Sequence, residues 1–569
     1  MASSLSFQGI STGLQTDQLV EAILSQESQP LQRLQDRQSR NNQRLAVLQS
    51  FKSSLTALST SFASLGGTSF NARTVSSTDT TNTYATVSAS GATVGTYDLK
   101  IGQVATRGRI APTLSGGNPT NLAVADAQST AVFTGSSATF AIRGTDGVIK
   151  TVTLGSANNS LYGLRDAINA LGTANPNDPT AKALGVTATV VNTGTGANPY
   201  QLVLTAKDTG TGTTSGVVTL ADVTAGGAVN TLGITAGTVD SLTTPTTLTG
   251  GLASAGTDVA QDAKFTLNGI DLVRKSNTVT DAVDGVTFNL KQGAQPTATT
   301  FTVALDKSAI TSAMQDAVSK FNAMLKVYKD ASGTGGALAN DPSVRSIVSQ
   351  VRAALAGTPA GLPTTATVTS TADLGLKTNR DGTLSLDATA FQAALDKDPA
   401  AAKRIFAFTG ESSNGAVSFY AGGSATTTGA VGFNITSFTS GGAVAGTLTV
   451  NGTDYSLTGT NGTLTGVAGT PLEGLILSVS ATGTGTLNLT RGVGQAVQDL
   501  VTSLTASGTG NLALIQSSIN TQNQTLTRQI TDGQARLDRR RTSLQAEFAK
   551  LEATVGQLQA AGQSLSGIR

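Results

Sequence analysis

The chain has 569 residues, of which 38% are hydrophobic and only 13% are charged, with 37 Lys and Arg against 35 Asp and Glu. This near balance of charge gives no overall attraction to nucleic acid or to an acidic membrane surface. Cysteine and histidine are both absent, which excludes disulfide bonds, thiolate metal sites, cysteine nucleophiles, histidine bases and histidine-containing zinc motifs.

The N-terminal stretch MASSLSFQGISTG lacks the basic and apolar regions of a cleaved secretory signal. No run of the sequence approaches the roughly 18 apolar residues that a membrane helix needs. We therefore expect no membrane insertion, and we expect any export to proceed without a cleaved signal peptide. The length allows several domains of roughly 100–200 residues each.

The first predicted helical region begins near Thr16, a suitable helix cap, and Pro30 predicts a break because proline lacks an amide donor. Polar Gln38 and Asn41 follow on the same face, so we expect weak packing there. Residues 66–67 are both glycine and should end the helix. Apolar residues recur before that end in the three-and-four spacing of a coiled-coil seam, at Leu48, Phe51, Leu55, Leu58, Phe62 and Leu65.

From about residue 68 the sequence changes to short stretches in which apolar and polar residues alternate, separated by glycine-rich turns. This pattern predicts β structure. The region 131–247 should contain a hairpin that turns at Asp146 and Gly147, followed by a short amphipathic helix in SLYGLRDAINAL. The stretch 244–258 is expected to be a linker or surface loop.

Helical spacing returns at 308–329, and Asp341 before a proline predicts the start of another helix. Asp381 followed by glycine predicts a tight turn between two short strands. Residues 409–488 are again rich in Thr and Gly in a pattern that predicts strands. The chain is predicted to be helical from about 491, with a glycine-rich break at 508–510.

This order of elements predicts an α+β multidomain protein with a helical coiled-coil stalk made from both termini and β-rich domains inserted between them. The predicted domains are a coiled-coil leg of 1–45 with 520–569, a helical domain of 46–70 with 306–408 and 489–519, a β-rich domain of 71–130 with 248–305, an outer β-rich domain of 131–247, and an additional β-rich insert of 409–488.

The C-terminal heptads are the strongest pattern, with apolar residues in steps of seven at Ile530, Leu537, Leu544, Leu551, Leu558 and Leu565. Two interpretations stay open: a coiled coil that binds a partner, and a hairpin of the two termini that serves only the fold. Gly533, Gly556 and Gly562 are expected to interrupt this helix, each costing about 1 kcal/mol against alanine. Arg540 and Glu547 place charges at alternate core positions, so the seam is only partly apolar and we expect it to be mobile until a partner covers it.

Other motifs are weaker. The basic cluster at Arg536, Arg539, Arg540 and Arg541 is interleaved with acids and lacks aromatic residues, so it favours a solvated or partner-facing helix surface over nucleic acid. GTGNLA at 508–513 fits a dinucleotide motif but follows a helix, and we interpret it as a helix break. KTNRDG lacks the spacing of a calcium loop and is explained by a turn. No catalytic, cofactor-binding or metal-binding residues are predicted.

Several stretches stand in the order typical of a known family. They are GTYDLKIGQVATRGRI, FTLNGIDLVRKSNTVTDAVDGVTFNLK, LGLKTNRDGTLSLDATAFQAALDKDPAAAKRIFA and an N-terminal signature carried by Gly9, Gly13, Leu14, Thr16, Asp17, Val20, Glu27, Pro30 and Leu31. These stretches resemble the FliD-type flagellar filament cap family, also called flagellar hook-associated protein 2. Gln15 and Val104 depart from its usual Asp and Leu. Residues 138–210 resemble an insert of flagellin-related hook and cap proteins, whereas 409–488 match nothing known to us.

The resemblance implies a structural protein rather than an enzyme. It implies a homo-oligomeric ring at the tip of the bacterial flagellum that contacts flagellin and the filament end, promotes flagellin folding and insertion, and prevents its loss. It further implies secretion through the flagellar type III apparatus after release from a flagellar export chaperone. Contact with host mucin and a role in cell adhesion are attributed to some family members. No cofactor is expected.

Two alternatives remain. A hook–filament junction protein also has helical termini and β-inserts, but the motifs around 374–408 argue against it. A Thr/Gly-rich surface adhesin would show a solenoid period and a membrane barrel or anchor, and the sequence shows neither of these patterns.

Overall fold

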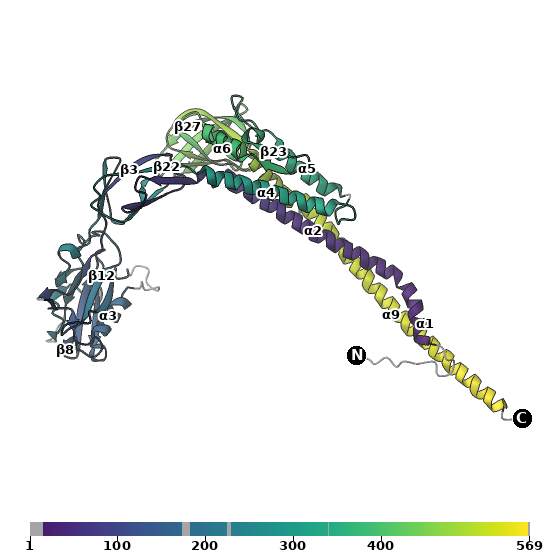
Figure 1. Cartoon of the computed structure of the whole chain (residues 1–569), viewed down its shortest axis with the longest axis horizontal. Coiled ribbons are helices and arrows are strands. Elements are labelled where there is room, and N and C mark those ends of the chain that lie inside the picture. The colour runs from purple at the N-terminus through teal and green to yellow at the C-terminus, as the bar shows by residue number, and fades with distance from the viewer. Residues whose placement is uncertain (1–14, 116, 173–181, 225–228, 340, 567–569) are drawn as a thin grey trace. The chain divides into compact units, whose positions relative to one another are not determined.

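The computed structural model describes residues 15–115, 117–172, 182–224, 229–339 and 341–566. Its contacts divide the chain into two units, Met1–Phe70 with Lys307–Arg569, and Asn71–Asp306. Helices lie toward both ends of the sequence and most strands lie between them, which confirms the predicted α+β order of elements (Figure 1).

Local chemistry explains several of the helix ends in the first unit, although Thr16, the expected cap, is the first residue of α1 and the N-cap position is Gln15 without a side-chain hydrogen bond. The break between α1 (Thr16–Glu27) and α2 (Gln29–Gly66) falls beside Pro30, which cannot donate a backbone hydrogen bond to the preceding turn. Asp341 caps α5 (Pro342–Ala356) through two backbone N–H groups of its first turn. The other helices of this unit are α4 (Lys307–Ser332), α6 (Ala388–Lys397), α7 (Pro399–Phe406), α8 (Val493–Thr505) and α9 (Asn511–Ser566). The gap before α9 confirms the predicted glycine-rich break.

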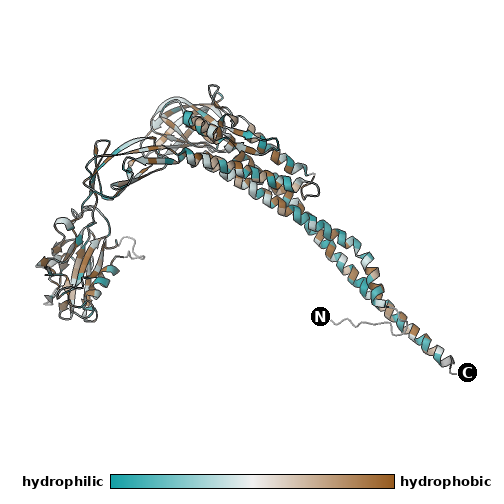
Figure 2. Cartoon of the chain, viewed as in Figure 1, coloured by the Kyte–Doolittle hydropathy of each residue, from teal (hydrophilic) through white to brown (hydrophobic). Residues whose placement is uncertain are grey.

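Helix α2 forms the centre of the helical core, because it packs against α4, α8 and α9. Apolar residues recur along it between polar ones (Figure 2). Phe62 of α2 stacks on Phe406 of α7 with ring centroids 6.5 Å apart. A Cβ atom on Gly494 of α8 would lie 2.6 Å from the Phe406 carbonyl oxygen and 3.1 Å from Phe62. Only glycine therefore allows α8 to approach this closely.

A small hairpin, β23 (Leu376–Thr378) with β24 (Leu384–Leu386), packs beside α4. It turns at Asp381 and Gly382, as predicted, and the glycine adopts a φ of +82°. Asn322 of α4 fixes the hairpin by bonding both the N–H and the C=O of Leu384, each at 2.8 Å.

Residues 408–491 form an eight-stranded antiparallel sheet between α7 and α8 in the sequence, where strands were predicted over 409–488. Its strands are β25 (Phe408–Ser412), β26 (Val417–Ala421), β27 (Gly429–Phe438), β28 (Ala443–Val450), β29 (Thr453–Thr460), β30 (Thr463–Thr465), β31 (Ile476–Val479) and β32 (Gly483–Arg491). The spatial order is β25-β32-β27-β28-β29-β30-β31-β26. The edge strands β25 and β26 contact each other, with the rings of Phe408 and Phe419 5.3 Å apart, so the sheet curls into a barrel around an apolar core.

In the second unit, two sheets share one core and combine strands from 73–103 with strands from 263–305. The five-stranded sheet has the order β1 (Arg73–Ser77), β22 (Thr299–Leu305), β3 (Gly95–Gln103), β18 (Ala263–Leu267) and β19 (Ile270–Arg274). The three-stranded sheet has the order β2 (Ala85–Ala89), β21 (Val286–Leu290) and β20 (Thr278–Val283).

A separate core of the second unit lies between two further sheets and α3 (Leu161–Ala170), the predicted amphipathic helix. One sheet has the order β10 (Ile149–Gly155), β9 (Ser137–Arg143), β13 (Thr219–Asp222) and β17 (Leu252–Ala253). The other combines β11 (Val186–Asn192), β12 (Tyr200–Ala206), β4 (Arg109–Ile110) and β7 (Ala123–Val124). The turn of the β9–β10 hairpin is the predicted one at Asp146 and Gly147.

This core includes Ile110 and Leu122 and so begins before residue 131, where the sequence placed the start of the outer domain. The two-residue strands there are too short to produce a visible periodicity. The stretch 244–258, predicted to be a linker or surface loop, instead contains two short strands, β16 (Leu248–Gly250) and β17. The remaining short elements are β5 (Leu114–Ser115), β6 (Asn118–Pro119), β8 (Phe133–Thr134), β14 (Val229–Asn230), β15 (Gly237–Val239), β16 (Leu248–Gly250), η1 (Ser69–Asn71), η2 (Ser156–Asn158), η3 (Gly256–Asp258) and η4 (Ala372–Leu374).

Candidate assembly surface

The helices from the two ends of the chain lie side by side and run in opposite directions (Figure 1). The Gln38 side chain donates to Thr527 at 2.7 Å, and Asn523 donates to Asn42 at 2.8 Å. Nearer the N-terminus, α1 lies against a later part of α9. The residue numbers therefore fall in α9 as they rise in α1 and α2. We call this paired region, α1 and the first half of α2 with α9, the leg.

The N-terminal set of predicted assembly residues lies inside the helical core. All six side chains are at most 1% exposed, and α2 packs against other helices of the same chain. The set is Leu48, Phe51, Leu55, Leu58, Phe62 and Leu65. These residues therefore stabilise the fold and offer no surface to a partner as long as the core is intact.

The C-terminal set divides along α9. Ile530 and Leu537 are half-buried, and Leu544 is only 4% exposed because it packs with Val20 and Leu24 of α1. Beyond the half-buried Phe548 the next two heptad leucines face solvent, with Leu551 47% and Leu558 66% exposed. The Leu565 side chain lies outside the described residues. The heptad pattern thus continues past the point where this chain covers it.

Polar residues occupy the middle of the leg, where weak packing was predicted. Besides the Gln38–Thr527 hydrogen bond, two buried atoms lack a partner, Nδ2 of Asn41 and Oδ1 of Asn523. A buried polar atom without a hydrogen bond costs about 1–3 kcal/mol. The middle of the leg is therefore a weak point of its packing, as the sequence indicated.

Two of the four clustered arginines pair with acids of α1. Arg541 Nη2 lies 2.6 Å from Glu21 Oε1, and Arg540 Nε lies 3.4 Å from Glu27 Oε1. Sequence reasoning expected a solvated or partner-facing surface and missed these pairs, because their members lie about 500 positions apart in the chain. The basic cluster thus contributes to the register of α1 on α9.

The predicted interruption of the C-terminal helix by glycines is wrong, since α9 runs unbroken from Asn511 to Ser566. Glycine keeps both its backbone hydrogen-bonding groups, so a cost of about 1 kcal/mol weakens the helix without breaking it. Gly533 instead faces α2, where an added Cβ would lie 3.2 Å from Leu31. A groove of about 480 Å³ opens there, lined by Glu27, Pro30, Leu31, Leu34, Gly533, Arg536 and Leu537.

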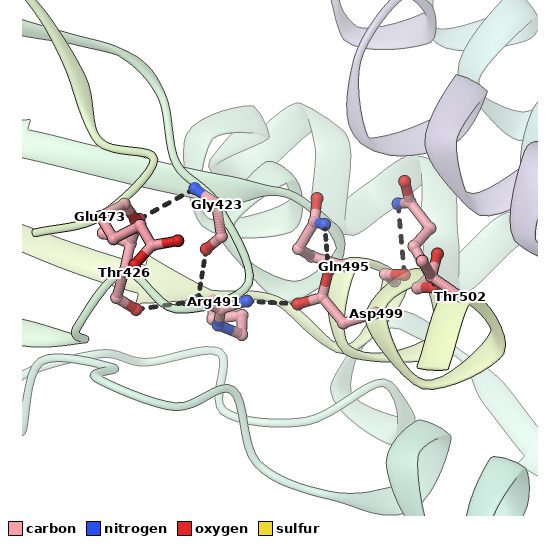
Figure 3. A network of polar contacts seen from close by, with 9 residues as sticks. Gly423, Thr426, Glu473, Arg491, Gln495, Asp499 and Thr502 are labelled. Carbon is pink, nitrogen blue, oxygen red and sulfur yellow. Dashed lines mark hydrogen bonds and ion pairs between the residues drawn. The ribbon is translucent and has the colours of Figure 1, made fainter. Parts of the chain in front are cut away.

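A second polar feature ties the β-barrel to the helices (Figure 3). Arg491, at the end of β32, forms an ion pair with Asp499 of α8. Its guanidinium also donates to the carbonyl oxygens of Gly423 and Thr426, at 2.9 and 2.8 Å. The ring of Phe408 lies 4.7 Å beneath the same guanidinium. One half-buried arginine therefore joins a barrel strand, a barrel loop and a core helix.

The described residues contain no group of three or more acidic, His or Cys side chains placed to hold a metal ion. GTGNLA lies at the break before α9, and KTNRDG forms the turn of the β23–β24 hairpin, as both were interpreted. Over the described ranges, no helix is both long and apolar enough to span a membrane.

Comparison with known proteins decides the family. Residues 12–108 match the family described as flagellar hook-associated protein 2 N-terminus, and residues 260–560 match flagellar hook-associated protein 2 C-terminus. The chain belongs to the FliD family of flagellar cap proteins. The C-terminal FliD match spans the barrel at 408–491, which the sequence alone could not place.

Individual FliD proteins are similar over much of their length. The B-type flagellar hook-associated protein 2 of Pseudomonas aeruginosa is 30% identical over 369 residues, which cover 62% of this chain and 70% of that protein. Flagellar hook-associated protein 2 of Escherichia coli K12 is 27% identical over 413 residues, or 70% of this chain and 79% of that protein. The crystal structure of the FliD D1-D2-D3 domains from Escherichia coli matches with a TM-score of 0.48 and 26% identity, covering 63% of this chain and 89% of that one.

The N-terminal signature residues of the FliD resemblance fall partly on the leg. Val20 is buried against α9, and Leu31 lines the groove beside Gly533. Glu27 pairs with Arg540. Gly9, Gly13 and Leu14 lie outside the described residues.

Proposed function

We propose that this protein caps the distal end of the bacterial flagellar filament, where it promotes the folding and insertion of flagellin and prevents its loss. Membership of the FliD family carries this proposal. In it, copies of the chain form a homo-oligomeric ring whose legs meet the filament end, and the matched family regions include both sides of the leg.

The surface proposed to act in assembly is the part of α9 beyond Phe548. Leu551 and Leu558 are exposed at heptad spacing, whereas the preceding heptad residue, Leu544, is buried against α1. Exposed leucines that continue a buried seam are suited to form a coiled coil with another helix. The predicted coiled coil therefore belongs, in this proposal, to contacts that α9 makes in the assembled cap.

Export through the flagellar type III apparatus and binding to an export chaperone before secretion complete the proposal, and both rest on the family. Host mucin remains a candidate further partner on the same ground. The predicted division into leg, helical domain, β-rich domains and insert is part of this proposal, with the outer β-rich domain starting before residue 131.

A flagellated strain lacking its own copy of this gene provides the test. It is complemented with the wild-type chain, with a Leu551→Glu/Leu558→Glu variant, or with Leu514→Glu as a control. Leu514 is a matched control because it is 51% exposed on the same helix. Filament length is measured by electron microscopy and flagellin in the medium by immunoblot.

The wild-type and control chains should restore long filaments. The double variant should leave short filaments and flagellin in the medium. Truncation after Phe548 should give the same result while leaving the α1 contacts of Leu544 in place. Full-length filaments with the double variant would contradict the proposed role of this surface. Normal filaments in the uncomplemented strain would contradict the proposed cap function itself.

A further inference from the structure

A cavity of about 490 Å³ lies in the helical domain, away from the leg. Its apolar lining comes from four side chains that are at most 7% exposed: Phe321, Leu355, Leu376 and Leu384. Its polar lining comes from Arg352, Ser370, Thr371, Lys377 and Thr378, with Gly382 at the hairpin turn. The cavity thus combines an apolar wall with two cationic side chains.

Arg352 is the unusual member of this lining. Its Nε atom is shielded from solvent and has no hydrogen-bond partner. Within the part of the chain that the structure describes, no acidic side chain lies within ion-pair distance of its guanidinium. A guanidinium offers a planar fork of N–H donors that matches a carboxylate, and leaving a buried donor unpaired is costly.

The acids around the cavity are already engaged. Asp381 accepts from Thr383 and pairs with Lys329 at 3.2 Å. Asp387 caps α6 and lies 3.3 Å from Lys377, which is therefore partly neutralised. Asp373 is held by the backbone N–H groups of residues 369 and 370. None of these carboxylates is placed to satisfy Arg352.

The hairpin turn leaves room for this arginine. A Cβ atom on Gly382 would lie 2.3 Å from Nη2 of Arg352 and 3.0 Å from its Cζ. A larger residue at 382 would have to shift the guanidinium and would itself adopt a strained φ of +82°. Glycine at 382 thus lets the turn and the arginine approach closely without strain.

We propose that this cavity binds a carboxylate carried on a short apolar stem, with the fork of Arg352 taking the carboxylate and the four apolar side chains taking the stem. Lys377 and the Thr378 hydroxyl group supply further donors at the rim. The carboxylate comes either from an acidic side chain of a neighbouring copy or from a small free acid. The proposal does not depend on the proposed cap function.

Phenylacetate is a suitable probe, and phenylacetamide is its uncharged match. Binding to the full chain is followed by saturation-transfer NMR. We expect saturable phenylacetate binding, with phenylacetamide and the Arg352→Gln variant each giving about tenfold weaker binding, because a charge-assisted pair is lost. Arg345→Gln is the matched control, since Arg345 is exposed on the same helix α5 and does not line the cavity. It should bind as the wild type does.

Arg352→Lys controls for a folding defect, because lysine keeps the positive charge but lacks the planar pair of N–H donors of the guanidinium. It should melt at the wild-type temperature and still bind more weakly. Equal binding of phenylacetate and phenylacetamide, or unchanged binding by Arg352→Gln, would overturn the proposal. Sedimentation velocity then separates the two sources. Weaker self-association of Arg352→Gln than of Arg345→Gln supports a carboxylate from a neighbouring copy, and equal self-association supports a free acid.

Discussion

The Arg541 guanidinium lies 2.6 Å from the Glu21 carboxylate, although the two residues stand 520 positions apart in the chain. Arg540 and Glu27 make a second contact of the same kind further along the helices. All four side chains are at least 42% exposed, so each pair contributes little to stability. What the two pairs supply is register, because both favour one alignment of α1 on α9.

Reversing one charge should loosen α1. Glu21→Arg places like charges at Arg541, and we expect the amides of α1 to exchange up to about fivefold faster, the range of an exposed pair. The double reversal Glu21→Arg/Arg541→Glu should restore protection. Asp36→Arg, at an exposed acid on α2, is the control. Equal exchange in the single and double variants would show that the pair does not set the register.

Gly494 and Gly562 should respond oppositely to alanine. Gly494→Ala puts a methyl group against Phe406 and Phe62, and we expect it to lower the free energy of unfolding by about 1–3 kcal/mol. Gly562 lies in α9 with nothing within 4 Å of its added Cβ, so Gly562→Ala should stabilise the helix by up to about 1 kcal/mol. Urea unfolding measures the first change, and circular dichroism of the helix measures the second.

The two sets of heptad residues should also differ. Leu55→Ala removes a side chain with no exposed surface and should cost about 2–5 kcal/mol of unfolding free energy. Leu558→Ala, at a side chain 66% exposed, should change it by no more than about 0.5 kcal/mol. Chemical denaturation of the purified chain compares them. A large loss in Leu558→Ala would mean that this leucine is covered by the chain itself.

Sequence patterns predicted features that depend on near neighbours. The break at Pro30, the cap at Asp341 and the hairpin turn at Asp381 each follow from local hydrogen bonding or backbone restriction, and the structure has all three. Helical spacing likewise predicted the apolar face of α2. The spacing does not indicate whether the same chain or a partner covers that face, because periodicity predicts only that the face is buried.

Long-range pairs were beyond such reasoning. Nothing in the local sequence links Arg541 to Glu21, or Arg352 to the turn at Gly382, since these contacts exist only once separate segments meet. For the glycines of α9, local reasoning instead predicted a feature that the structure does not have. Local propensity predicted an interruption at Gly533, but glycine keeps its backbone hydrogen-bonding groups and the 56-residue helix continues through it.

Acid should weaken the β23–β24 turn through Asp381. Hydrogen bonds from the Thr383 side chain and backbone, with the nearby Lys329 ammonium, lower the pKa of Asp381 from about 3.8 to about 2. A depressed carboxylate pKa gives stability that is present above pH 4 and is lost as the pH falls toward 2. The difference in unfolding free energy between the wild type and Asp381→Asn should therefore shrink over that interval. Urea titrations at a series of pH values test this, and a constant difference would contradict it.

Arg491 should couple the barrel to the helical core. Its side chain is 13% exposed and that of Asp499 is 24% exposed. Loss of the guanidinium therefore leaves a largely shielded carboxylate that keeps the hydrogen bond donated by the Gln495 side chain. We expect Arg491→Met to lower the free energy of unfolding by about 2–3 kcal/mol and to raise amide exchange in β25 and β32 first.

The double variant Arg491→Met/Asp499→Leu provides the control for this coupling. It removes the stranded charge together with its partner, and replacement of both members by apolar groups is often close to neutral. Part of the lost stability should therefore return. If the double variant is as unstable as the single one, the lost stability comes from the hydrogen bonds to Gly423 and Thr426 rather than from the ion pair. In that case Arg491→Lys should be as unstable as Arg491→Met.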